Sequence, residues 1–171
     1  MITTDALKIA VLTLSDSRTL EQDRSGSYLC ESLQEAGHQL ADRRLIPDDI
    51  YQMRAVVSQW IADPQVQVIL TTGGTGVTGR DSTPEAIMPL LDKQIEGFGE
   101  LFRLISYEEL GSSALHSRAL AGQANATLIF CIPGSTGACR TAWTKILQPQ
   151  LDITTKPCNF ATMLPRFKEG L

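Results

Sequence analysis

The sequence predicts a three-layer α/β/α sandwich built on a mainly parallel sheet. Three short apolar segments, at residues 8–14, 66–70 and 127–132, have the length and composition of buried strands. Segments with helical spacing of apolar residues alternate with them, which is the pattern of a parallel α/β sheet. No linker or internal repeat interrupts the 171 residues, so we expect one domain spanning residues 1–171.

The first buried strand leads into the first predicted helix. Residues 8–14 read KIAVLTL and are apolar on both faces, as in a central parallel strand. Residues 15–24 are polar and charged, so they form the loop at the carboxyl end of this strand. An amphipathic helix is predicted at 25–36, with Gly37 in the position of a C-cap glycine.

A weaker strand and a second helix come next. Residues 39–46 predict a strand toward an edge of the sheet, and Pro47 ends it. Asp48 is expected to cap the following helix, with Asp49 in its first turn. Apolar residues recur at helical spacing over 50–61, which defines the body of this helix.

The rest of the chain continues the alternation. Helices are predicted at 84–91, 100–109 and 138–147 from the spacing of their apolar residues. Residues 93–98 are typical of a short extended segment, and 112–121 fit either a short helix or an extended segment.

The stretch TTGGTG at residues 71–76 joins the second buried strand to a loop and a helix. The loop carries Arg80 and Asp81, and Ser82 marks the start of the helix. Glycines let the backbone approach a ligand closely, and the N–H groups and dipole of a helix start favour negative charge. We therefore predict a site for a phosphate or carboxylate group here.

Other interpretations of this stretch are weaker. It is not a Walker A loop, because no Gly-Lys-Ser/Thr follows the glycines. Gly74, Gly76 and Gly79 match GxGxxG, but they do not open the helix directly as a dinucleotide site requires. A capped turn with Ser82 and Glu85 as a capping box leaves the adjacent glycines, the threonines and the loop aspartate unexplained.

Polar loops follow all three buried strands, at 15–24, 72–81 and 133–137. In sheets of this kind, ligands bind outside the carboxyl ends of the strands. We therefore expect the three loops to converge on one site.

The composition argues against several classes of function. The formal net charge is −4, and no basic stripe of the kind that binds nucleic acid is present. No apolar run is long enough to span a bilayer, and the first residues lack the apolar core of a signal peptide. The four cysteines are scattered without a CxxC pair, so no structural zinc site is expected. We expect a cytoplasmic protein that binds neither nucleic acid nor membranes.

The motif TTGGTGVTGRDSTPEA resembles the signature of the molybdopterin-binding domain of the MoaB/MogA family of molybdenum cofactor biosynthesis proteins. This family is related to the G domains of gephyrin and plant Cnx. Further segments resemble the family in the expected order, namely IAVLTLSDSR, DRSGSYL, RLIPDD, GFGELFRLIS, SRALAG, LIFCIPGSTGACRTAW and PCNF. The resemblance covers nearly the whole chain and is closest to the MoaB branch.

This resemblance implies a nucleotidyltransferase, molybdopterin adenylyltransferase. The terminal phosphate of molybdopterin would attack the α-phosphate of ATP, releasing pyrophosphate and forming adenylyl-molybdopterin. Such a reaction depends on alignment, Mg²⁺ and backbone donors more than on covalent catalysis. The implied cofactor is Mg²⁺, with ATP and molybdopterin as substrates. The resemblance also implies a homotrimer or hexamer and transient contact with a separate molybdate-inserting protein.

The resemblance assigns the catalytic and metal-binding roles to Asp48 in RLIPD and Asp81 in GRDSTPEA. Each follows a strand in a loop before a helix, and Mg²⁺ prefers carboxylate and phosphate oxygens. A helix cap alone would explain Asp48 equally well, and Asp49 is an adjacent alternative. Contacts with the nucleotide and the pterin are implied for Ser15, Asp23, Ser25, Gly26, Thr72, Gly73, Gly74, Thr75, Gly76, Ser106, Pro133, Gly134 and Ser135.

A second function, from another class, stays open. The MoaB-like segments also fit a molybdopterin- or nucleotide-binding oligomer without turnover, either a carrier or a redundant paralogue. The presence of both Asp48 and Asp81 favours the enzyme, provided that both side chains point into one pocket.

Overall fold

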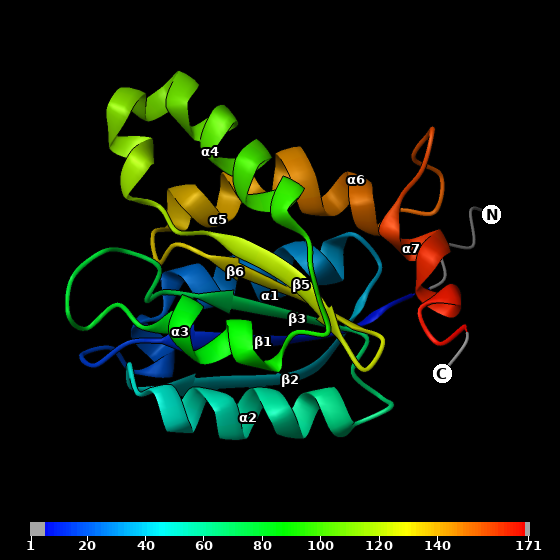
Figure 1. Ribbon diagram of the computed structural model, residues 1–171, viewed down its shortest axis with the longest axis horizontal. Coiled ribbons are helices and arrows are strands. Elements are labelled where there is room, and N and C mark those ends of the chain that lie inside the picture. Colours follow the sequence, from blue (N-terminus) through cyan, green and yellow to red (C-terminus); the bar gives the residue numbers. More distant parts are fainter. Residues whose placement is uncertain (1–5, 170–171) are drawn as a thin grey trace.

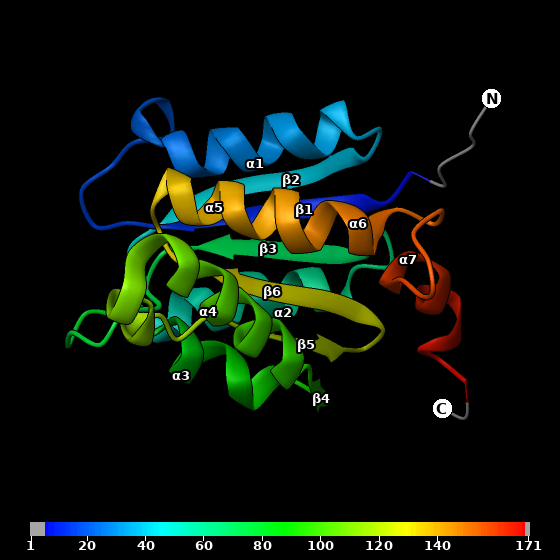
Figure 2. The ribbon, with the colours of Figure 1, turned by 90° about the horizontal axis from the view of Figure 1, so that it is seen from above.

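The computed structural model describes residues 6–169, which form a six-stranded sheet with helices on both faces (Figure 1, Figure 2). The strands lie in the order β2-β1-β3-β6-β5-β4. Their bounds are β1 Lys8–Leu14, β2 Gln39–Ile46, β3 Val68–Thr72, β4 Lys93–Gln94, β5 Leu120–Ala124 and β6 Thr127–Ile132. β2, β1, β3 and β6 run parallel, whereas β5 pairs antiparallel with both β6 and β4. The predicted α/β/α sandwich with a mainly parallel sheet is confirmed.

The helices cover the sheet in two layers. They are α1 Arg24–Glu35, α2 Ile50–Ala62, α3 Thr83–Ile87, α4 Glu96–Leu110, α5 Thr136–Ala142, α6 Gln148–Leu151 and α7 Phe160–Met163. Short 3₁₀ turns lie at Leu20–Gln22, Met88–Leu90, Gly111–His116 and Leu164–Arg166, and a π-helical turn, Trp143–Leu147, joins α5 to α6. No helix of the described residues is long and apolar enough to cross a membrane.

Two apolar layers hold the helices against the sheet. On one face, Ile9 and Val11 of β1 belong to a cluster with side chains of α1, α4 and α5, including Phe102. On the other face, Leu12 belongs to a cluster with side chains of α2 and α3, including Met53. Neighbouring side chains of a strand point to opposite faces, so a strand covered on both sides must be apolar throughout. β1 therefore lies inside the sheet, while the less apolar β2 forms its edge, as predicted.

Several element bounds differ from the prediction. β3 spans Val68–Thr72 rather than 66–70, so the two threonines that follow the apolar run are part of the strand and are buried. α4 begins at Glu96, which places the GFG sequence inside the helix. The ambiguous segment 112–121 contains both a 3₁₀ turn and the beginning of β5. Sequence periodicity missed β5, because it is short and three of its five residues are alanine or glycine.

The cap predicted for α2 is wrong, and α3 begins after Ser82 as predicted but without the capping bonds. The N-cap of α2 is Asp49, whose carboxylate accepts a hydrogen bond from a backbone N–H of the first turn at 2.8 Å, and not Asp48. Within residues 6–169, the Ser82 side chain makes no capping bond to α3, and Glu85 pairs with Arg118 instead. Asp48 and Glu85 are therefore free of the structural roles that their positions suggested.

Candidate functional site

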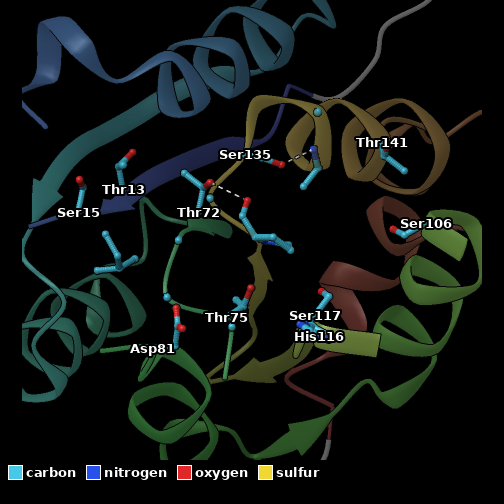
Figure 3. Close-up of a pocket in the computed structure, with 18 of the residues that line it drawn as sticks. Thr13, Ser15, Thr72, Thr75, Asp81, Ser106, His116, Ser117, Ser135 and Thr141 are labelled. Carbon is cyan, nitrogen blue, oxygen red and sulfur yellow. Dashed lines mark hydrogen bonds between the residues drawn. The ribbon is translucent and has the colours of Figure 1, made fainter. Parts of the chain in front are cut away.

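A cleft of about 670 Å³ opens at the carboxyl ends of β1, β3 and β6 (Figure 3). Residues 13–18 line it from the end of β1, residues 72–76 and Asp81 from the end of β3, and residues 133–135 from the end of β6. These strands are parallel neighbours, so their carboxyl ends meet at one edge of the sheet. The expected convergence of the three loops is confirmed. α4 and the 3₁₀ turn that follows it form the opposite wall.

The loop after β3 turns through two glycines with left-handed backbone conformation. Gly73 has a φ of 110° and Gly74 a φ of 68°. A Cβ atom on Gly73 would lie 2.5 Å from the carbonyl oxygen of Leu14, and one on Gly74 would collide with Thr83 Oγ1 and lie 2.9 Å from Asp48 Oδ1. Glycine is required at both positions, by conformation and by close approach.

The loop after β6 packs directly on this glycine-rich loop. The Thr72 hydroxyl donates to the Pro133 carbonyl at 3.1 Å. A Cβ atom on Gly134 would lie 3.2 Å from Gly73 Cα, so the two backbones are nearly in contact. Ser135 then caps α5 by accepting a hydrogen bond from a backbone N–H of its first turn at 3.1 Å. Together the two loops form one continuous floor of the cleft.

Four carboxylates line the cleft, and the fold shifts the pKa values of Asp48, Asp81 and Asp16 in different directions. Burial raises the pKa of Asp48 above its ordinary value, and the nearby carboxylates of Asp16 and Asp81 add to the rise. The pKa of Asp81 is lowered, chiefly because the Thr78 hydroxyl donates to its Oδ2 at 2.6 Å. The pKa of Asp16 is lowered by hydrogen bonds from the Arg80 guanidinium, at 2.7 to 2.9 Å. Of these three carboxylates, Asp48 is thus the one whose charge the fold stabilises least.

The Asp48 side chain fits the requirements of a magnesium ligand. Its Oδ1 is buried and has no hydrogen-bond partner among the described residues. A buried, unpartnered oxygen beside two other carboxylates would be relieved by a cation. Within residues 6–169, no three His, Cys, Asp or Glu side chains are grouped closely enough to hold a metal by themselves. The arrangement suits Mg²⁺, which is commonly held by one or two carboxylates together with phosphate oxygens of a substrate.

Most of the site residues predicted from sequence line this cleft. They are Ser15, Asp48, Thr72, Gly73, Gly74, Thr75, Gly76, Asp81, Ser106, Pro133, Gly134 and Ser135. Asp48 and Asp81 face the same cavity, although Asp48 precedes α2 in the sequence and Asp81 follows β3. Figure 3 shows Asp81 and Thr75 on one side of the cleft, with Ser106 and Thr141 on the helices across from them.

Three predicted contact residues, Asp23, Ser25 and Gly26, do not line the cleft themselves but lie against segments that do. The Asp23 carboxylate is buried, where it accepts hydrogen bonds from the Thr13 hydroxyl at 2.6 Å and from the Gly26 N–H at 2.9 Å. The Ser25 hydroxyl donates to the Gly134 carbonyl at 2.8 Å. These residues lie behind the cleft wall, so their role in the structure is to fix the two loops in front of them.

Of the wall formed by α4 and the following turn, the sequence-based prediction included Ser106 but missed the other polar side chains. Glu109, His116 and Ser117 line the cleft there, although His116 stands outside every motif. Asp16 was also missed, although it directly follows Ser15 in the first loop. These other residues of the wall could not be found from local pattern, because they reach the cleft only through the packing of α4 on the sheet.

The chain is similar to known proteins over the residues that form this cleft. Residues 10–153 match the family described as "Probable molybdopterin binding domain". Over 153 residues the chain is 58% identical to molybdenum cofactor biosynthesis protein B of Escherichia coli K12, covering 90% of each chain. A crystal structure of molybdenum cofactor biosynthesis protein B matches with a TM-score of 0.83 and 46% identity, over 85% of this chain and 91% of that one. A structure of MogA matches with a TM-score of 0.75 and 25% identity, over 84% and 97% of the two chains.

Proposed function

Because the chain belongs to the MoaB/MogA family of molybdenum cofactor biosynthesis proteins, we propose that it is a molybdopterin adenylyltransferase. An oxygen of the terminal phosphate of molybdopterin forms a bond to the α-phosphorus of ATP. The bond from that phosphorus to the bridging oxygen breaks, and pyrophosphate leaves with the electron pair. The attacking phosphate is already anionic, so no side chain has to remove a proton from it.

The buried, unpartnered oxygen of Asp48, facing the same cleft as Asp81, is the observation that carries this proposal. Asp48 and Asp81 would hold Mg²⁺, which would neutralise phosphate charge during the transfer. The glycine-rich floor would let the backbone approach the phosphates, and the Gly73 and Gly74 conformations fix its shape. The chain's own contribution is therefore alignment of two phosphates and control of charge.

The charge of the cleft supports a requirement for a metal. Within the described part of the chain, its lining carries four carboxylates, those of Asp16, Asp48, Asp81 and Glu109, against the guanidinium of Arg18. A free triphosphate would be repelled by such a surface. The chemistry also differs from that of a thiol enzyme, because Cys139 is fully buried against Thr72 and Pro133 and burial raises its pKa to about 11. A thiol with that pKa is protonated at neutral pH and is a poor nucleophile.

The proposal is tested by mixing the purified protein with molybdopterin, ATP and Mg²⁺ and measuring pyrophosphate and the pterin product together. We expect equimolar release of both, and none when EDTA replaces Mg²⁺. Binding of molybdopterin without product would instead support a carrier or redundant paralogue. Neither binding nor product would contradict the assignment to molybdopterin itself.

We also propose that the protein is a homotrimer or hexamer whose product passes to a separate molybdate-inserting protein. α4 and its following turn expose several large apolar side chains, which supports a covered surface there. They are Leu101, Leu104, Tyr107, Leu110 and Leu115, between 43% and 81% exposed.

The expected result of light scattering after size exclusion is a trimer or a hexamer. Leu104→Glu should shift it toward monomer, while Tyr51→Glu, at an even more exposed apolar residue of α2, should not. A clean wild-type monomer would contradict the proposal.

A further inference from the structure

The loop that delivers Asp81 to the cleft is exposed and largely closed on itself. Residues 77–80 are exposed, and Figure 1 shows this loop projecting between β3 and α3. The Thr78 N–H donates to Asp81 Oδ2 at 2.9 Å, and the Asp81 N–H donates to the Thr78 carbonyl at 3.1 Å. These bonds shape the turn, but they do not attach it to the rest of the protein. Arg80 does attach the loop to the end of β1 through Asp16, but both side chains of that pair are exposed. A second attachment, on the other side of the loop, fixes where the Asp81 carboxylate stands.

Arg118 supplies that contact from the segment that leads into β5. Its backbone N–H donates to the Thr75 carbonyl at 2.9 Å. Its Nε donates to the Gly76 carbonyl at 2.8 Å, and its Nη2 donates to the Asp81 carbonyl at 3.1 Å. One side chain therefore joins the beginning and the end of the loop, across about forty residues of sequence.

Glu85 orients the guanidinium from the other side. Its carboxylate, on α3, pairs with Arg118 through Nη1 and also accepts from Nη2 at 3.3 Å. This pairing lowers the pKa of Glu85, chiefly through the hydrogen bond from Arg118. Glu85, which the sequence suggested as half of a capping box, thus holds Arg118 against the loop and does not cap α3.

Arg118 does not line the cleft but borders a separate hollow behind the loop, together with Glu85 and Asp81. We propose that Arg118, held by Glu85, is a positioning residue that fixes the 76–81 loop and with it the Asp81 carboxylate. This inference rests on the proposed function. Arginine is needed because its planar fork offers donors in several fixed directions, whereas lysine offers one point charge.

The first test measures turnover of Arg118→Ala and Arg118→Lys in the molybdopterin assay. We expect kcat to fall about 10- to 100-fold in both, with a smaller change in the KM for molybdopterin, because misplacing a reacting group affects the transition state most. A few millimolar guanidinium should restore part of the kcat of Arg118→Ala and none of Arg118→Lys. Arg166→Ala is the matched control, since Arg166 pairs with Glu169 and neither residue lines the cleft, so kcat should stay unchanged.

The second test measures hydrogen exchange of the peptide over residues 76–82 and does not depend on activity. Arg118→Ala should exchange faster there than the wild type, while the melting temperature stays within a few degrees. Unchanged exchange, or unchanged kcat with faster exchange, would overturn the inference. A wild type without turnover would overturn the proposed function and the catalytic part of this inference, while the exchange result would still show whether Arg118 holds the loop.

Discussion

Alanine in place of Asp48 is expected to slow adenylyl transfer about 100-fold or more while leaving the protein at least as stable as the wild type. Asp48 has its pKa raised in the folded state by burial and by its acidic neighbours. A raised carboxyl pKa means that the ionised form destabilises the fold at neutral pH, so removing it does not cost stability. The measurements are kcat and the free energy of unfolding at pH 7.

Asp49→Ala is the matched control for this prediction. The Asp49 carboxylate caps α2, so its loss should lower the free energy of unfolding by about 1 kcal/mol. Turnover should remain near the wild-type value, because Asp49 does not line the cleft. If the two variants exchanged these effects, with Asp49→Ala inactive and Asp48→Ala merely less stable, the assignment of the functional acid would be wrong by one residue.

Gly74→Ala is expected to be the second severe change, affecting both folding and activity. The φ of 68° at this position costs an L-residue about 1 kcal/mol or more, and the new methyl group would collide with Thr83 and press on Asp48. We expect a lower melting temperature and a fall in kcat of about 100-fold, since Asp48 would be displaced.

Gly79→Ala, in the same loop, should be close to neutral in both measurements. Among the described residues nothing lies within 4 Å of a Cβ atom at Gly79. Equal damage from the two substitutions would show that the loop tolerates no added side chain anywhere. The loss of activity in Gly74→Ala could then not be attributed to the contact between the added methyl group and Asp48.

The three central strands and their loops could be predicted because their signals are local. β1, β3 and β6 each contain a short apolar run, and polar, glycine or proline residues follow each strand. A parallel sheet then brings the loops together without further information. This is why most of the cleft floor, from Thr72 to Gly76 and from Pro133 to Ser135, could be predicted before the structure.

The remaining features depend on packing that no local pattern encodes. Asp48 and Asp49 are chemically identical neighbours. Which one caps α2 and which one faces the cleft depends on how the start of α2 packs in the fold. Asp23 and Ser25 lie in a family motif, but the packing of α1 places them behind the loops and not in front. The α4 wall, with Glu109 and His116, reaches the cleft across a turn that the sequence left ambiguous.

The measurement that tests the central claim most directly is the transfer of label from ATP carrying a labelled α-phosphate to molybdopterin, with wild type and Asp81→Asn side by side. The account predicts labelled adenylyl-molybdopterin from the wild type with Mg²⁺, and at least about 100-fold less from Asp81→Asn. The melting temperature of Asp81→Asn should fall only slightly, because the lowered pKa of Asp81 means that its charge stabilises the fold at neutral pH. Equal transfer by both proteins would contradict the site. Tight binding of molybdopterin by a wild type that transfers no label would contradict the enzyme.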